Sequence, residues 1–280
     1  MRVGLIQLSV GDNPADNLTT TLSLVKQAAD RGATLICTPE VTNGVSSSRA
    51  LQEAVLAREV DDITLAGLRD TARTLGVWIA VGSLALKTGD ADGRFANRSI
   101  VISDQGEIVD RYDKIHMFDV QVSETEQFRE SAGYRPGSRA VVAKTPLATL
   151  GLTVCYDLRF AQLYRVLAQA GAEVLLVPSA FLPTTGAAHW EPLLRARAIE
   201  TGCFVVAAAQ TGTHAMTDQG NAGQPRQTYG HSMVISPWGK VLADAGAAVG
   251  VTVVDLDLAE VAQARSRLPS LSHDRPFTGP

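Results

Sequence analysis

Short apolar runs alternate with segments of helical periodicity along the whole chain. Residues 3–8 form an apolar run that ends at Ser9, as a buried strand would. Asn13 and Pro14 follow, a pair typical of an N-cap and a first helical position. Apolar side chains then recur at helical spacing, at Leu18, Leu22, Val25 and Ala29. Residues 34–38 form the next apolar run, so the order predicts a parallel β-α-β unit.

The same alternation predicts the remaining elements. Further helices are expected at residues 61–75, 158–170, 190–201 and 260–267. Further strands are expected at residues 77–84, 98–103, 107–112, 147–155, 174–178, 203–209, 233–235, 240–244 and 251–256. Two strand pairs flank short turns, at residues 104–106 and 237–239, and should form antiparallel hairpins. Because the chain has no linker or repeat, residues 1–280 are predicted to be one α/β domain with mixed parallel and antiparallel sheets covered by helices.

Three segments lack clear periodicity. Residues 113–139 are polar, and an irregular loop of that length in a compact domain is usually functional or disordered. Residues 214–226 are polar and contain glycine, which favours a surface loop over the site or at a subunit contact. The tail at residues 269–280 is irregular, and we expect it to pack on a partner.

Composition narrows the classes of function. Of 280 residues, 45% are hydrophobic and 19% charged, and the formal net charge is -4. A mildly acidic globular chain without a long basic run is a poor candidate for binding nucleic acid or an anionic membrane surface. Its apolar runs are strand-sized, shorter than the roughly 20 residues of a membrane span. The first strand pattern starts at once, without a signal-peptide pattern, so a cytoplasmic protein is expected.

The cysteines are few and odd in number. Cys37, Cys155 and Cys203 argue against a disulfide framework and for a reducing compartment. No CxxC, HExxH or Cys/His cluster indicates a metal site. Cys37 and Cys203 lie inside apolar runs, where structural burial is the simpler interpretation.

Cys155 is the first candidate for chemistry. It ends an apolar strand and precedes the predicted helix at 158–170, which places it at the sheet edge where α/β folds bind ligands. Backbone N–H groups that open the next helix can stabilise a thiolate and a developing oxyanion. The alternative is a small buried apolar residue.

Two further residue types complete a nucleophilic site. Glu40 follows the second strand at the same sheet edge and can accept a thiol proton, although a solvated loop glutamate would look the same. Lys114 follows the strand at 107–112 and can bind an oxyanion, although a surface lysine is the simpler interpretation. His116 is a rival general base or a structural hydrogen-bonding group. The next loop contains the acidic residues Glu124, Glu126 and Glu130.

The order of these residues resembles one known family. Several motifs carry the likeness: Pro39-Glu40, Tyr112-Asp113-Lys114-Ile115-His116, Gly151 to Phe160 (GLTVCYDLRF), Pro178-Ser179-Ala180-Phe181, residues 188–191 and 195–200, Ala207 to Gln210, Tyr229-Gly230-His231-Ser232 and Pro237-Trp238-Gly239. Across essentially its whole length the chain is similar to the nitrilase, or carbon–nitrogen hydrolase, superfamily. Within it, the chain looks most like the Nit branch, which holds deaminated-glutathione amidase and ω-amidase.

The resemblance implies a fold and a set of catalytic residues. The fold is an α-β-β-α sandwich that pairs into a longer four-layer assembly, as a homodimer or higher homo-oligomer. The catalytic residues are Glu40, Lys114 and Cys155, with a second glutamate for which Glu130 matches better than Glu126. Lys114 and the backbone N–H of Tyr156 would hold the oxyanion, and Cys155 would carry a thioester. No metal or organic cofactor is needed.

The resemblance also implies a small carboxylated amide as substrate. Arg159 stands where branch members bind a substrate carboxylate, and a planar guanidinium suits that group. A salt bridge at the helix start is the alternative role for Arg159. Phe181 and Thr185 fall where branch members line the same pocket. An α-keto or amino acid ω-amide, or a γ-linked peptide ending in an amide, would fit. A preference for deaminated glutathione over α-ketoglutaramate would place the protein among metabolite-repair enzymes.

Two departures and three rival functions remain. Ala161 replaces the usual proline after Arg159-Phe160, and residues 41–48 differ from the aromatic-containing stretch of the branch. An N-carbamoyl amidohydrolase would use the same residues and release carbon dioxide with ammonia. A nitrile-hydrolysing enzyme fits the Cys155 context less well. A non-catalytic or redox-thiol binding module has no chemical need for the whole set, and no resolving cysteine is evident.

Overall fold

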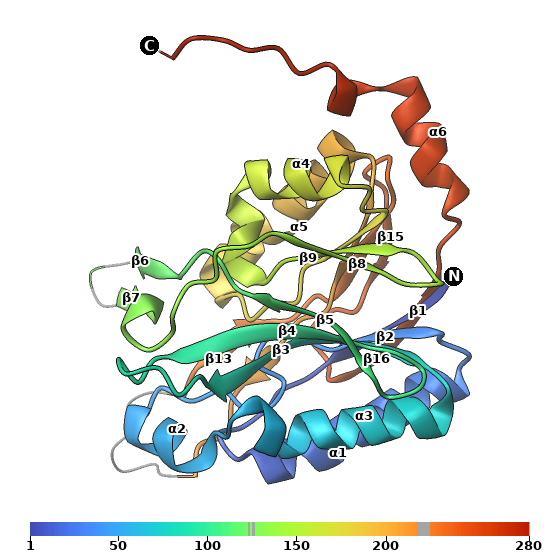
Figure 1. Cartoon of the computed structure of the whole chain (residues 1–280). Helices are drawn as coiled ribbons and strands as arrows, with labels where there is room; N and C mark the ends of the chain where they lie inside the picture. Colours follow the sequence, from blue (N-terminus) through green and yellow to red (C-terminus); the bar gives the residue numbers. More distant parts are fainter. Residues whose placement is uncertain (123, 125–126, 218–224, 280) are drawn as a thin grey trace.

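Two six-stranded sheets stack face to face in the computed structural model, which describes residues 1–122, 124, 127–217 and 225–279 (Figure 1). The first sheet has the strand order β16-β1-β2-β3-β4-β5 and the second has the order β15-β14-β11-β10-β9-β8. The first sheet is built from β1 (Arg2–Gln7), β2 (Leu35–Cys37), β3 (Trp78–Lys87), β4 (Phe95–Ile102), β5 (Ile108–Asp113) and β16 (Gly250–Asp255). The second is built from β8 (Val141–Lys144), β9 (Thr149–Leu152), β10 (Val174–Leu176), β11 (Phe204–Ala207), β14 (Met233–Ile235) and β15 (Val241–Asp244).

Each sheet is parallel at its centre and antiparallel at its edges. In the first sheet β1, β2 and β3 are parallel, and β16, β4 and β5 run antiparallel to their neighbours. In the second sheet β9, β10 and β11 are parallel, while β8, β14 and β15 are antiparallel. The predicted β-α-β unit and both predicted hairpins are therefore confirmed, and so is the expected mixed α/β class.

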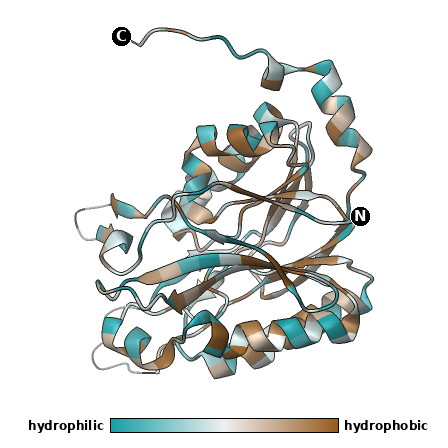
Figure 2. Cartoon of the chain, in the orientation of Figure 1, coloured by the Kyte–Doolittle hydropathy of each residue, from teal (hydrophilic) through white to brown (hydrophobic). Residues whose placement is uncertain are grey.

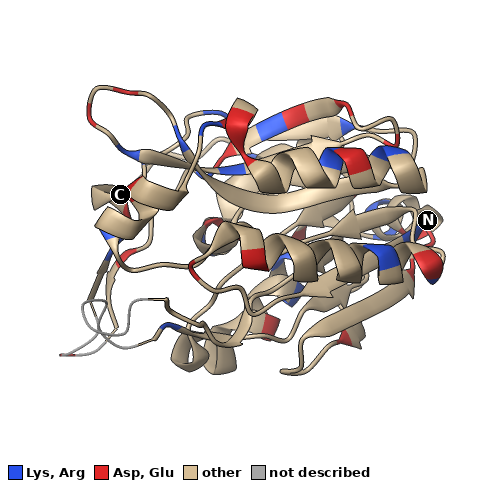
Figure 3. Ribbon diagram, turned by 90° about the horizontal axis from the view of Figure 1, so that it is seen from below, with Lys and Arg blue, Asp and Glu red and all other residues tan. Residues whose placement is uncertain are grey.

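Helices cover the outer face of each sheet, which completes an α-β-β-α sandwich (Figure 1). Helices α1 (Pro14–Asp30) and α3 (Ile63–Leu75) lie below the first sheet, and α4 (Ala161–Gln169) and α5 (Pro183–Thr201) lie above the second. Apolar side chains of α1 and α3 face inward, and the hydrophilic stretches are seen on the outer surfaces of these helices (Figure 2). Acidic and basic residues are interspersed along those surfaces (Figure 3).

The alternation of side chains along β2 divides the core. Leu35 and Cys37 pack in a cluster with Leu150 and Leu175 of the second sheet, so they face the interior of the sandwich. Ile36, between them, packs instead with residues of α1 and α3. This division follows from the two-residue period of a strand, which sends successive side chains to opposite faces. A strand buried on both faces reads as a continuous apolar run, as residues 34–38 do.

Local signals in the sequence explain where the first helices begin. The side chain of Asn13 accepts a hydrogen bond from the Ala15 N–H at 3.1 Å, with Pro14 at the first helical position of α1. Asp62 caps α3 through the Leu65 N–H at 2.8 Å, so that helix begins at Ile63 rather than at residue 61. A short helix, α2 (Arg49–Val55), was not expected; Ser48 caps it, but its apolar stretch is too short to show a helical period.

Three other expectations need correction. The predicted strand at 147–155 ends at Leu152, and Cys155 lies in the 3₁₀ turn Cys155–Arg159. The predicted helix at 190–201 begins earlier, at Pro183, because that proline occupies a first helical position and Pro192 is accommodated inside the helix. The stretch 113–139 is not wholly irregular, since it contains the small hairpin of β6 (Asp119–Gln121) and β7 (Gln127–Arg129) and a 3₁₀ turn at Glu130–Ala132.

The remaining segments lie at the periphery. A second hairpin pairs β12 (Thr211–Thr213) with β13 (Gln227–Tyr229) across the expected loop at 214–226, of which residues 218–224 lie outside the described part. After β16, the helix α6 (Ala259–Arg267) and a 3₁₀ turn at Ser270–Ser272 lead into a tail that runs away from the sandwich (Figure 1). Among the described helices, none is long and apolar enough to cross a membrane.

Candidate active site

The segments that follow β2, β5 and β9 meet at one edge of the sandwich. Glu40 comes from the first sheet and Cys155 from the second, so the site lies where the two sheets face each other. A side chain at Gly82 would collide with the Thr38 and Pro39 carbonyl oxygens and with Pro178, at 2.1, 2.4 and 2.5 Å. Only glycine therefore permits the chain before Glu40 to approach the second sheet this closely.

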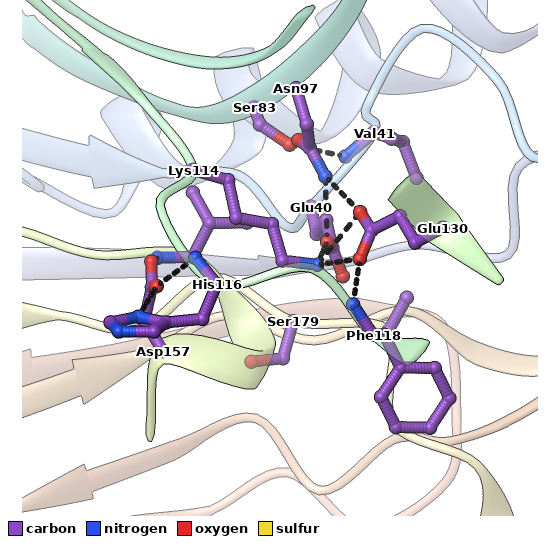
Figure 4. Close-up of polar contacts among 12 residues, drawn as sticks. Glu40, Val41, Ser83, Asn97, Lys114, His116, Phe118, Glu130, Asp157 and Ser179 are labelled. Carbon is purple, nitrogen blue, oxygen red and sulfur yellow. Dashed lines mark hydrogen bonds and ion pairs between the residues drawn. The ribbon is translucent and has the colours of Figure 1, made fainter. Parts of the chain in front are cut away.

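Lys114 lies between two carboxylates (Figure 4). Its Nζ lies 2.9 Å from Oε1 of Glu40 and 2.9 and 2.8 Å from the two carboxylate oxygens of Glu130. The side chain of Lys114 is 2% exposed, against 6% for Glu40 and 14% for Glu130. Buried charges of this kind need partners, and two anions around one cation hold the ammonium group in a fixed position.

Two groups that sequence reasoning missed hold these carboxylates in place. The buried Asn97, on β4, donates from Nδ2 to Oε1 of Glu40 at 2.9 Å and to Oε1 of Glu130 at 3.3 Å. The backbone N–H of Phe118 donates to Oε2 of Glu130 at 2.7 Å. Asn97 precedes the strand predicted at 98–103 by one residue, so no pattern in the sequence marked its amide as buried on β4.

Cys155 sits in strained backbone. Its φ is 51°, a left-handed conformation that costs a residue with a side chain about 1–3 kcal/mol. The Cys155 N–H donates to the Pro178 carbonyl at 2.9 Å and so fixes that turn. Val41, next to Glu40, also has a positive φ of 47°, and its N–H donates to Ser83 Oγ at 2.8 Å. Of the three described non-glycine residues with a positive φ, two thus lie at the site, and the third is His231.

The Cys155 side chain lies next to Glu40 and Ala180, and all three residues line one cavity. Burial and the charge of Glu40 raise the pKa of Cys155 well above its usual range, although Lys114 and the Ala180 N–H oppose that rise. Burial alone would raise the pKa of Glu40, but the charge of Lys114 and the hydrogen bonds from Cys155 and Lys114 hold it below the ordinary value. The resting site therefore has a neutral thiol beside an ionised carboxylate, an arrangement for general-base activation.

Lys114 remains a cation in this environment. Burial disfavours its charge, but the carboxylates of Glu130 and Glu40 outweigh burial and raise the pKa of Lys114 well above its usual range. A permanently charged ammonium next to the sulfur is suited to stabilising an oxyanion.

His116 is placed elsewhere. Its ring Nδ1 lies 2.7 Å from Oδ1 of Asp157, and its backbone N–H donates to the same oxygen at 3.0 Å. Figure 4 shows the His116 and Asp157 pair on the far side of the Lys114 segment from Glu130. Asp157 also accepts from the Tyr112 hydroxyl at 2.7 Å and the Val154 N–H at 2.9 Å. Of the two roles left open for His116, the geometry supports the structural one, because these contacts brace the turn that carries Cys155.

A cavity of about 710 Å³ opens over the sulfur. Residues from both sheets line it, among them Glu40, Lys114, Glu130, Cys155, Tyr156, Arg159, Phe181 and Thr185. The structure thus brings together every residue that the resemblance singled out. Glu126, the other candidate for the second glutamate, lies outside the described residues.

Arg159 forms no ion pair within the described chain. Its Nη atoms lie 3.3 and 3.4 Å from Nδ1 of His189, and its guanidinium lies 5.6 Å from the centre of the Phe181 ring. The salt bridge at the helix start, which was the alternative role, is not formed with any described residue. Arg226 and Arg129 also line the cavity, and sequence reasoning did not single them out.

The donor set does not resemble a metal centre. In the ranges that the structure describes, no group of three or more His, Cys, Asp or Glu side chains could hold a metal ion.

Comparisons with known proteins identify the family of this chain. The family model described as carbon-nitrogen hydrolase matches residues 2–266. A protein of Yersinia enterocolitica named deaminated glutathione amidase is 41% identical over 275 residues, covering 98% of this chain and 92% of that protein. The Caenorhabditis elegans NitFhit crystal structure has a TM-score of 0.87 at 32% identity; the match covers 98% of this chain and 65% of the NitFhit chain.

A third match bears on the sulfur. A mutant of the amidase from Nesterenkonia sp. AN1, 26% identical with a TM-score of 0.76, shows Michael addition of acrylamide at its active site cysteine, and the match covers 96% of this chain and 98% of that one. The family model and the relatives define the class of this protein as a hydrolase of carbon–nitrogen bonds. This chain belongs to the carbon-nitrogen hydrolase family.

Proposed function

We propose that this chain is a thiol amidase that hydrolyses the C–N bond of a small carboxylated amide of the deaminated-glutathione type, through a thioester on Cys155. The observation that carries the proposal is the position of Lys114, held 2.9 Å from Glu40 and 2.8 Å from Glu130 beside the Cys155 thiol at the base of the cavity. The relatives named deaminated glutathione amidase support the substrate class.

Acylation begins with proton transfer within the site. Glu40 accepts the thiol proton while the sulfur attacks the amide carbonyl carbon. Lys114 and the Tyr156 N–H stabilise the resulting oxyanion, and loss of one such donor typically costs about 10²–10³ in turnover. Glu40 then returns the proton to the amide nitrogen as the C–N bond breaks, which leaves a thioester and releases ammonia or an amine.

Deacylation uses the same groups. Glu40 takes a proton from water, the hydroxide adds to the thioester carbonyl, and the carbon–sulfur bond breaks to give the acid product. The departing sulfur regains its proton from Glu40. Throughout the cycle Glu130 holds Lys114 in place, and its own contact with the Phe118 N–H at 2.7 Å fixes that carboxylate.

The charge of the cavity supports an anionic substrate. Its described lining contains four cationic side chains, Lys114, Arg129, Arg159 and Arg226, and two anionic ones, Glu40 and Glu130. The whole chain has a net charge of -4, so this cationic excess is local. A cleft in which one sign of charge predominates concentrates substrates of the opposite charge. Arg159, Phe181 and Thr185 are the proposed binding residues.

The test is product release from a panel of compounds. Purified protein is incubated with deaminated glutathione, α-ketoglutaramate, glutamine, an N-carbamoyl amino acid and a simple nitrile. The proposal predicts fast hydrolysis of a carboxylated amide and little hydrolysis of the last two. Faster hydrolysis of the N-carbamoyl compound would overturn the proposal in favour of the carbamoyl reaction.

Assembly and location belong to the same proposal. Two-fold pairing into a homodimer is supported by the resemblance and by the exposed apolar side chains of Ile199 and Trp238, which are 52% and 56% exposed. Light scattering after gel filtration tests it, and a mass of one chain would refute it. A role in metabolite repair follows from the proposed substrate, and the few, odd-numbered cysteines support a reducing, cytoplasmic site of action.

A further inference from the structure

Three arginines line the cavity, and they differ in their surroundings. Arg129 is exposed, and its charge lowers the pKa of the nearby Asp119, so it is partly neutralised. Arg159 and Arg226 are half-buried, and neither forms an ion pair within the described residues. Two guanidinium groups without a carboxylate partner therefore face the same cavity.

Arg159 and Arg226 lie on either side of one short segment. The Ala180 carbonyl accepts a hydrogen bond from Nη2 of Arg226 at 3.1 Å. The ring of the next residue, Phe181, lies 5.6 Å from the guanidinium of Arg159. Since Ala180 and Phe181 line the same cavity as Cys155, this segment places both cations in the cavity of the reacting thiol.

Arg226 has unused donors. A guanidinium carries five N–H groups in a fixed fork, and Nη2 uses one of them for the Ala180 carbonyl. Its buried Nε has no hydrogen-bond partner in the described structure. A buried donor without a partner is costly, and an anion that accepts from it would satisfy it.

We propose that Arg226 binds a second anionic group of the substrate, separate from the carboxylate that Arg159 binds. The preferred substrate is then a linear amide with two carboxylates, one for each arginine. This inference rests on the proposed function and adds to it a residue that selects between substrates with one and two carboxylates.

A competing role follows from the same geometry. The charge of Arg226 also lowers the pKa of Glu40. If Arg226 served only to keep Glu40 ionised, its loss would reduce the hydrolysis of every substrate by the same factor. It would also move the acidic limb of the pH profile of kcat/KM to higher pH.

The experiment compares three amides that differ only in their carboxylates. Deaminated glutathione has a carboxylate at each end, and each of its two monoamides lacks one of them. Wild type, Arg226→Gln and the matched variant Arg159→Gln are assayed for kcat/KM on all three. Arg226→Lys, which keeps the charge but not the fork, provides a second variant. Alkylation of Cys155 by iodoacetamide checks that each variant is folded around the thiol.

Arg226→Gln is expected to lose about tenfold to a hundredfold on the diacid, mostly through KM, as loss of a charge-assisted hydrogen bond implies. On the monoamide that lacks the carboxylate bound by Arg226, the loss of kcat/KM in Arg226→Gln should shrink to less than threefold. Arg159→Gln should likewise lose less than threefold on the other monoamide, which lacks the carboxylate bound by Arg159. Arg226→Lys should show a smaller loss with the same selectivity. An equal loss on all three amides overturns the inference and leaves the amidase activity standing. Failure of wild type to hydrolyse any of the three overturns the proposed function as well.

Discussion

Glu130 offers a sharp test of how the site positions Lys114. In Glu130→Gln the side chain keeps its size but loses its charge. The two carboxylate oxygens of Glu130 together accept from Lys114 Nζ, Asn97 and the Phe118 N–H. An amide has only one accepting oxygen, and its NH₂ group would face donors. At least one contact of Lys114 is therefore lost while Glu40 keeps its own.

The structure sets the size of the effect. A hydrogen bond to a charged group is worth about 1.5–3 kcal/mol, and each 1.36 kcal/mol of barrier is tenfold in rate. Glu130→Gln is therefore expected to lower kcat about 10- to 100-fold. KM should change less than about threefold, because Lys114 acts on the oxyanion, which forms after the substrate binds.

The assay is steady-state ammonia or amine release with the amide that wild type hydrolyses fastest. Glu124→Gln is the matched control, because it removes the same charge from the same 113–139 stretch at an exposed position. Cys155 alkylation shows whether each variant retains its thiol environment. A kcat within threefold of wild type in a folded Glu130→Gln variant would refute the positioning role of Glu130.

Three further predictions concern the surroundings of the site. Asn97→Asp places a third carboxylate against Glu40 and Glu130; it should raise the pKa of Glu40, move the acidic limb of kcat/KM to higher pH and lower kcat at least about tenfold, and an unmoved limb would contradict this. Asp157→Asn replaces one buried accepting oxygen with an NH₂ group that faces donors, so the free energy of unfolding in urea should fall by about 2–4 kcal/mol. A fall below about 0.5 kcal/mol would contradict the bracing role of Asp157. Burial lowers the pKa of His214 from 6.5 to about 4, so the unfolded chain takes up the proton first as pH falls. The contribution of His214 to the free energy of unfolding is therefore full above pH 6.5 and should decline by about 3 kcal/mol towards pH 4. His214→Gln should remove this part of the pH dependence measured by urea denaturation.

The fold was largely predictable because local signals in this sequence agree with the tertiary structure. Asn13-Pro14 caps a helix, and the apolar run at 34–38 is a strand buried on both faces. The predicted ends of helices and strands were wrong where the tertiary structure overrode the local sequence pattern. The strand before Cys155 ends at Leu152 because the chain enters a 3₁₀ turn in which Cys155 has a φ of 51°, a conformation that no local periodicity encodes.

The site was predictable only where the sequence carried a family pattern. Glu40, Lys114 and Cys155 lie far apart along the chain, and position alone gave each of them a simpler interpretation. Asn97 and Arg226 could not be found in the same way. Their significance depends on contacts between segments far apart in the chain, such as the 2.9 Å hydrogen bond from Asn97 to Glu40 and the 3.1 Å hydrogen bond from Arg226 to Ala180.

The central claim is that the sulfur of Cys155 attacks the amide. The most direct test of this claim measures product release by Cys155→Ala, with Cys37→Ala as the control. Both residues are buried free cysteines, but Cys37 lies within β2 and has no proposed role in the reaction. The account predicts no enzymatic release above the uncatalysed rate for Cys155→Ala, with an unchanged fold by circular dichroism, and release within about threefold of wild type for Cys37→Ala. Retained hydrolysis in purified Cys155→Ala would contradict the account.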